Sequence, residues 1–108
     1  MKSILQNIPT NLSKEVFETL LENNSIKIKR IISKGHTSPE SGWYDQEQHE
    51  WVLLMEGAAC ISFEEGQETK LGKGDYLNIP ARVKHKVSWT DPSCKTIWLA
   101  IFYGGQQT

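Results

Sequence analysis

The pattern of hydrophobic and polar residues divides the chain into two parts. In residues 11–24 apolar side chains recur four positions apart, with Val16 and Leu20 forming one pair and Phe17 and Leu21 the other. This spacing is typical of an amphipathic helix. Because so short a helix is only marginally stable alone, we predict that it packs on the outside of a sheet or on a second subunit.

From residue 25 onward apolar and polar positions alternate, which is the period of β-strands. Gly, Pro, Asn, Asp and Ser separate the alternating runs and predict turns between them. Strands are predicted at residues 26–32, 43–46, 51–55, 58–63, 68–71, 76–79, 83–89 and 96–103, with a loop at 34–42 between the first two. On the first strand, Lys27, Lys29 and Arg30 are assigned to the solvated side. Many short strands after a single helix favour an all-β sandwich or barrel over repeated β-α-β units.

The last run, residues 96–103, is apolar on both faces. One face can fill the interior of a barrel. We assign Trp98 and Phe102 to the other face, which then needs cover from the helix or from a second copy of the chain. This reasoning predicts a homodimer.

Composition limits the classes of function. With 108 residues the chain is one domain that buries about 65% of its unfolded surface. Its formal charge of −1 gives no overall attraction to nucleic acid or to an anionic membrane. We find no secretion signal and no apolar run of about 20 residues, so a cytoplasmic protein is predicted. The 2 cysteines lack a Cys-x-x-Cys spacing, which argues against a thiolate metal site.

Residues 74–85 carry the clearest motif. Gly74 suits a tight turn, Pro80 makes the following loop rigid, and His85 enters the next strand. The order of glycine, five residues, proline, four residues and histidine resembles the second motif of the cupin family.

A second segment supports the same resemblance. Glu50 is followed seven positions later by Gly57, similar to the first cupin motif, and the resemblance covers roughly residues 26–103. It implies a jelly-roll barrel, so the fold class expected is all-β with a short N-terminal helix. We therefore predict three parts: a lead-in and helix at 1–24, a cupin barrel at 25–103, and a flexible tail at 104–108.

The resemblance also implies a metal site, because cupins commonly bind a divalent ion through four side chains. These are two histidines placed shortly before the glutamate, the glutamate itself, and the histidine of the second motif. Only Glu50 and His85 carry over to this chain. The places of the histidine pair fall on residues without imidazole: Trp43 and Asp45, or Tyr44 and Gln46.

Other residues are candidates for the missing ligands. His36 can replace one histidine if its loop folds over the barrel mouth, and Asp45 or Gln46 can bind through oxygen. Tyr44 and Trp43 are candidates for contacts to a substrate. In the alternative interpretation these are ordinary loop or rim residues.

Two hypotheses of function remain open. In the first, the barrel binds one divalent metal (Mn, Fe, Ni or Zn), a small polar ligand, or both. If it is an enzyme, the resemblance implies metal-assisted chemistry on a small organic acid, sugar or phenolic compound. In the second, the chain is a non-catalytic, metal-free cupin that binds a small molecule or acts as an interaction module. Glu50 and His85 favour the first hypothesis, and the missing histidine pair favours the second.

Overall fold

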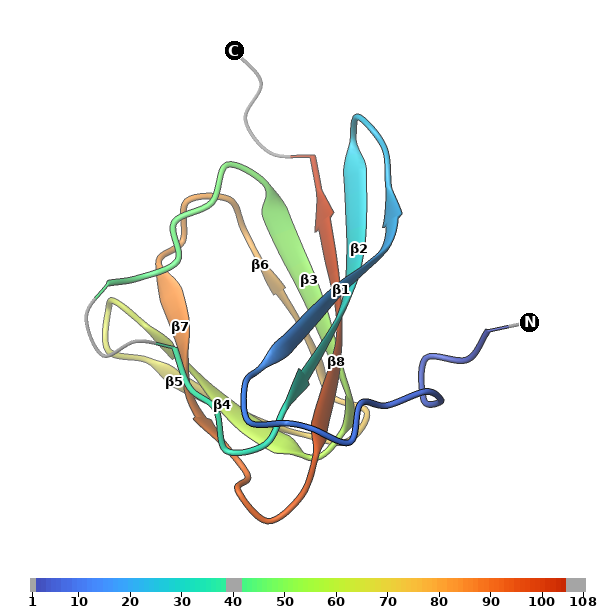
Figure 1. Cartoon of the computed structure of the whole chain (residues 1–108). Helices are drawn as coiled ribbons and strands as arrows, with labels where there is room; N and C mark the ends of the chain where they lie inside the picture. Colours follow the sequence, from blue (N-terminus) through green and yellow to red (C-terminus); the bar gives the residue numbers. More distant parts are fainter. Residues whose placement is uncertain (1, 39–41, 105–108) are drawn as a thin grey trace.

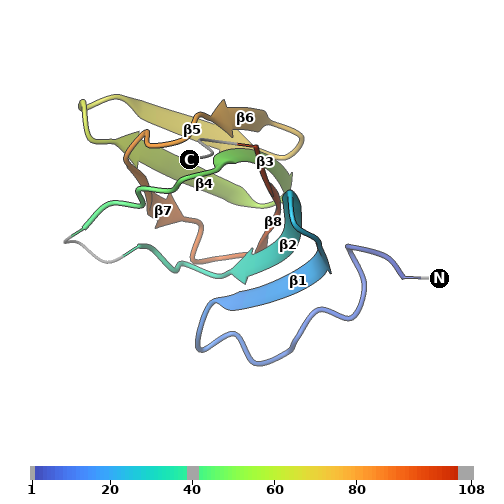
Figure 2. The same ribbon diagram turned by 90° about the horizontal axis from the view of Figure 1, so that it is seen from above.

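The chain folds into two antiparallel β-sheets that face each other, as Figures 1 and 2 show for the computed structural model, which describes residues 2–38 and 42–104. The strands are β1 (Val16–Glu22), β2 (Ile26–Ser33), β3 (His49–Glu56), β4 (Ala58–Phe63), β5 (Glu68–Gly72), β6 (Tyr76–Ile79), β7 (His85–Thr90) and β8 (Thr96–Tyr103). The larger sheet has the order β1-β2-β8-β3-β6 and the smaller one β5-β4-β7. This arrangement confirms the predicted all-β architecture.

The predicted N-terminal helix is wrong, because β1 occupies its place. β1 is an edge strand that pairs with β2 from Val16 opposite Ile32 to Glu22 opposite Lys27. A bulge between Thr19 and Leu21 inserts one residue into the alternation. Strand pairing with β2 therefore decides the structure of a segment whose helix would be marginal alone. The described residues contain no helix long and apolar enough to cross a membrane.

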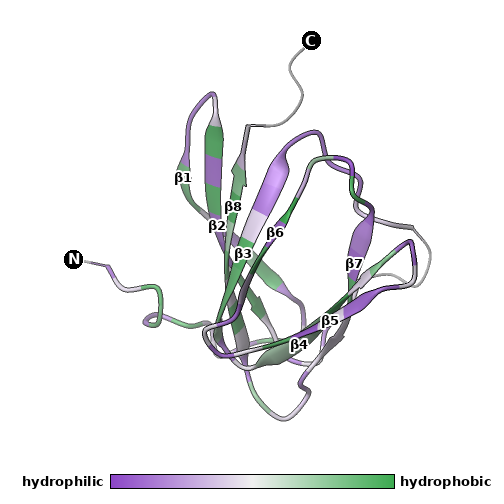
Figure 3. Ribbon diagram, turned by 180° about the vertical axis from the view of Figure 1, so that it is seen from behind, coloured by the Kyte–Doolittle hydropathy of each residue, from purple (hydrophilic) through white to green (hydrophobic). Residues whose placement is uncertain are grey.

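The core lies between the two sheets. Its buried side chains come from five strands and are Val52, Leu54, Ala59, Ile61, Leu71, Ile79, Trp98 and Ala100. Figure 3 shows a mostly hydrophobic β8, a β2 in which hydrophobic and hydrophilic positions alternate, and more hydrophilic β5 and β7.

The inward face of β8 differs from the one we predicted. Trp98 and Phe102 line the cavity between the sheets, and Trp98 is only 4% exposed. Because side chains alternate along a strand, Leu99, Ile101 and Tyr103 face the outer side of the large sheet. These three side chains are only partly buried. β8 therefore has an apolar outer face, but Trp98 and Phe102, which we had assigned to it, lie on the inner face.

The turn before β6 follows the sequence-based prediction. Gly74 has a φ of 89°, in the left-handed region that favours glycine. Its N–H donates to the Leu54 carbonyl at 2.7 Å, and the Leu54 N–H donates to the Asp75 carbonyl at 2.9 Å. These two bonds join the turn to β3 and align the strand that carries Glu50.

The predicted strand at 43–46 is reduced to a single bridge between Tyr44 and His85. The predicted loop at 34–42 includes residues 39–41, which lie outside the described residues, as do residues 105–108 of the predicted tail.

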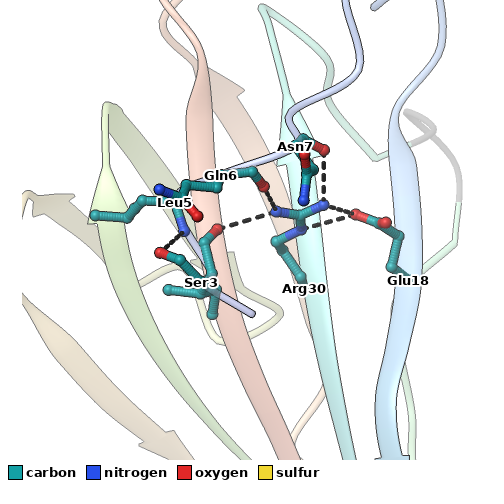
Figure 4. A network of polar contacts seen from close by, with 7 residues as sticks. Ser3, Leu5, Gln6, Asn7, Glu18 and Arg30 are labelled. Atoms are coloured by element: carbon teal, nitrogen blue, oxygen red, sulfur yellow. Dashed lines mark hydrogen bonds and ion pairs between the residues drawn. The ribbon is translucent and has the colours of Figure 1, made fainter. Parts of the chain in front are cut away.

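Arg30 on β2 joins an N-terminal segment to the large sheet by hydrogen bonds (Figure 4). The Arg30 guanidinium donates to the backbone carbonyls of Ile4, Gln6 and Asn7 at 3.1, 2.7 and 3.2 Å. It also pairs with the Glu18 carboxylate, with Arg30 Nη2 lying 2.6 Å from Glu18 Oε1. The sequence had suggested a solvated Arg30, but the residue is 5% exposed because these acceptors surround it.

Candidate functional site

Three polar side chains meet between the two sheets. Glu50 comes from β3 in the large sheet, His85 begins β7 in the small sheet, and Gln46 lies in the segment that leads into β3. His85 Nε2 is 3.2 Å from Glu50 Oε1, and Gln46 Nε2 donates to the same oxygen at 2.9 Å. Both members of the Glu50–His85 pair are buried, with side chains 12% and 5% exposed.

The backbone around His85 holds the imidazole in one orientation. The ring Nδ1–H donates to the Val83 carbonyl at 2.9 Å, since a carbonyl can only accept. His85 and Tyr44 exchange two backbone hydrogen bonds, at 2.8 and 3.2 Å. The Nδ1 atom therefore carries a proton, and Nε2 is the atom presented to Glu50 and to the cavity.

The electrostatic environment favours a protonated imidazole. Burial lowers the pKa of His85, but the hydrogen bond to Glu50, the hydrogen bond to the Val83 carbonyl and the negative charge of Glu50 together outweigh it. The pKa is consequently raised above its ordinary value. Glu50 and His85 thus form a hydrogen-bonded imidazole–carboxylate pair that can hold or release one proton at Nε2.

This pair lies on the wall of a cavity of about 160 Å³. The cavity walls combine aliphatic side chains with four aromatic ones, which are Phe17 from β1, Tyr44, and Trp98 and Phe102 from β8. The Tyr44 ring centroid is 5.7 Å from that of His85, and Tyr44 is 45% exposed. A small cavity with aromatic walls and a few converging polar groups is typical of a small-molecule site.

The structure brings together four of the seven predicted site residues, which are Gln46, Glu50, His85 and Tyr44. The other three do not line the cavity. His36 receives the Lys34 N–H on Nδ1 at 2.9 Å, and its Nε2 lies 3.4 Å from the Ser13 carbonyl.

Asp45 and Trp43 make contacts away from the Glu50–His85 pair. The Asp45 carboxylate is 3.4 Å from the guanidinium of Arg82, a residue whose φ of 67° lies in the left-handed region. The Trp43 ring lies 4.5 Å from Lys86 Nζ. Any role for these two residues as ligand or substrate contact stays a prediction.

Sequence reasoning also missed cavity residues that belong to neither motif, among them Glu15 just before β1, Phe17 on β1 and Lys29 on β2. Phe17 was assigned to a helix, and Lys29 was placed on the wet side of its strand. A signal for Lys29 was available, because it is in phase with Ile31, which also lines the cavity.

The residues in the cavity provide only part of a ligand set for a metal ion. Among the residues that the structure describes, no three His, Cys, Asp or Glu side chains gather in one place. His85 would bind an ion through Nε2, which its Nδ1–H bond to Val83 orients, and Glu50 would bind through its carboxylate. Gln46 would contribute its amide oxygen if the amide turned over. Such an ion would supply a Lewis acid at this wall of the cavity.

The raised pKa of His85 leads to a prediction about stability. Its contribution is fully present below about pH 6.5, the ordinary value, and is lost as the pH rises through the higher folded-state pKa. With a chelator present to remove metal ions, we expect the free energy of unfolding of the wild type to fall as the pH rises above about 6.5. Urea denaturation at several pH values measures this slope. His85→Gln should flatten it, and an identical slope in the variant would show that other groups are responsible.

A jelly-roll barrel with a polar cluster beside an internal cavity defines a class of small-molecule-binding β proteins. The family model described as "Cupin domain" matches residues 31–102. The chain therefore belongs to the cupin family, which confirms the resemblance seen in the two motifs. Among curated proteins, none matches the chain.

Solved structures agree with this family. A protein from Ralstonia eutropha JMP134, provisionally assigned as a mannose-6-phosphate isomerase, is 38% identical with a TM-score of 0.91. The match covers 97% of this chain and 98% of that one.

More distant structures share the fold. A cupin superfamily protein from Desulfitobacterium hafniense DCB-2 is 18% identical with a TM-score of 0.74, covering 89% of this chain and 83% of that one. A DMSP lyase from Ruegeria pomeroyi DSS-3 is 18% identical with a TM-score of 0.71. This match covers 87% of the present chain and 49% of the lyase.

Proposed function

We propose that this cupin binds a small polar organic molecule in its cavity and that the Glu50–His85 pair recognises it. The observation that carries the proposal is a buried imidazole–carboxylate pair on the wall of a 160 Å³ cavity. Buried, perturbed ionisable groups in a concave site are typical of binding and catalytic sites. The mannose-6-phosphate isomerase assignment of the relative from Ralstonia eutropha supports a polar ligand.

Glu50 has an atom available for the ligand. Its Oε1 accepts from Gln46 and faces His85, while Oε2 has no hydrogen-bond partner among the described residues. A ligand hydroxyl can donate to Oε2, and His85 Nε2 can donate to a ligand oxygen or return a proton to it. The pair thus offers both an acceptor and a donor at one place.

A divalent metal at the same place is the second candidate. It is favoured by the tautomer of His85, because an imidazole that donates from Nδ1 to a carbonyl has Nε2 available as a ligand. The proposed ions are Mn, Fe, Ni or Zn, bound through His85, Glu50 and the amide oxygen of Gln46.

Two measurements on protein purified without an affinity tag test both candidates. In a screen of small polar compounds by NMR, binders should shift the signals of Trp98 and His85, and Glu50→Gln should abolish those shifts. Glu56→Gln serves as the control, because Glu56 lies on the same strand, is partly exposed and pairs with Lys73. Absence of any binder, or binding unchanged in Glu50→Gln, would contradict the proposal.

Elemental analysis showing about one metal equivalent, lost in His85→Ala, would support the metal-bound form.

We also propose a homodimer and a cytoplasmic location. The dimer is supported by the outer face of the large sheet, where partly buried Ile28, Ile101 and Trp51 lie in register across β2, β8 and β3. A row of this kind on the solvent side is typical of an interaction surface.

A further inference from the structure

We propose that Lys29 anchors the anionic group of the cavity ligand, so that the ligand is a small organic anion. This inference rests on the proposed function and goes further by naming the chemical class. Lys29 lies on β2, lines the cavity, and places its Nζ 5.7 Å from the centroid of the Phe102 ring. It forms no ion pair with any residue that the structure describes, although six other basic residues do.

The strand register places Lys29 one row away from Glu50, on the other side of β8. On β8, Ala100 lies between Lys29 and Val52, and in the next row Phe102 lies between Lys27 and Glu50. The backbones of β2 and β3 are two strand spacings apart, which is about 10 Å. The ammonium leans over Phe102 toward the row of Glu50, so a short ligand above the Phe102 ring would reach both groups.

The charges around the cavity favour an anion at Lys29. Glu50 faces His85, and Glu15 accepts a hydrogen bond from the Ser33 hydroxyl at 2.6 Å. Ser33 is four residues from Lys29 along β2, about 13 Å away, so Glu15 does not neutralise this ammonium. A half-buried ammonium without a carboxylate partner binds a carboxylate or phosphate more tightly than a neutral group.

The aromatic walls determine the rest of the ligand. Phe17, Tyr44 and Phe102 suit a flat or apolar body between the two polar ends. Suitable probes are therefore 4-hydroxybenzoate, its neutral analogue 4-hydroxybenzamide, and phenyl phosphate. The hydroxyl of the first two probes can reach Glu50 while the opposite end faces Lys29. The phosphate tests whether the anion is a carboxylate or a phosphoryl group.

Calorimetry or NMR titration with these probes tests the inference. We expect wild-type protein to bind an anionic probe at least about tenfold more tightly than the amide. Lys29→Met should reduce this ratio to about threefold or less, and Lys29→Arg should keep it. Lys27→Met is the matched control, because Lys27 lies two residues away on β2 but pairs with Glu22 and does not line the cavity.

The outcomes separate the two proposals. Equal binding of acid and amide that is lost in Glu50→Gln would overturn the role of Lys29 and leave the proposed function intact. If the folded Lys29→Met variant still prefers anionic probes, the proposed role of Lys29 is also overturned. Binding of none of the probes, with no other ligand found in the screen, would overturn both. Thermal unfolding of each variant verifies that the protein is folded.

Discussion

Replacing Gly57 with alanine is expected to reduce the free energy of unfolding by about 3 kcal/mol or more. Gly57 has a φ of 91°, where an L-residue is strained. A Cβ at this position would lie 2.5 Å from Thr96 Oγ1 and 2.6 Å from the Lys95 carbonyl. Because one contact is backbone at the start of β8, the clash cannot be relieved by a side-chain rotation. Urea denaturation measures the loss.

Gly74 provides the matched control. Its φ of 89° is nearly the same, but no atom lies within 4 Å of the position that a Cβ would take. Gly74→Ala should therefore lose only the conformational part, about 1–2 kcal/mol. The difference between the two variants isolates the steric clash at β8. Equal losses would mean that backbone conformation alone accounts for the glycine at position 57.

Seven of the strands after residue 25 could be predicted from local signals, because alternation and turn residues indicate strands directly; the strand predicted at 43–46 is only a bridge. β1 could not, because its bulge between Thr19 and Leu21 breaks the period of two. The inserted residue is Leu20, which moves Leu21 opposite Ile28. The i, i+4 spacing of its apolar residues then matches that of a helix, and only the partner strand decides between the two structures.

The candidate site was predictable only where a motif reports it. Glu50 and His85 are 35 positions apart, yet the two motifs placed both in one hollow, and the structure puts their side chains 3.2 Å apart. Lys29 was missed because a charged residue on a strand was assigned to the solvated face. The assumption that a charged strand residue faces solvent outside the sheet fails beside a cavity, since the ammonium can face the space between the sheets.

Replacing Arg30 with methionine is expected to lower the free energy of unfolding by about 3 kcal/mol. The guanidinium is buried and bonds three backbone carbonyls of the N-terminal segment as well as the Glu18 carboxylate (Figure 4). Glu18 is 38% exposed in its side chain, so water can partly solvate its charge when Arg30 is lost. For that reason the expected loss is smaller than for a fully buried pair.

The same variant should release the N-terminal segment from the sheet. Hydrogen exchange of the Leu5 and Gln6 amides, which donate to Ser3, should increase in Arg30→Met, because the segment around them loses the donor that its three carbonyls share. Lys27→Met on the same strand removes an ion pair that is exposed, and should change stability by less than about 0.5 kcal/mol without affecting exchange. If both variants behave alike, Arg30 is not what attaches the segment. Arg30 can be buried because its acceptors come from residues far away in the sequence. The sequence of β2 itself gives no indication of these acceptors.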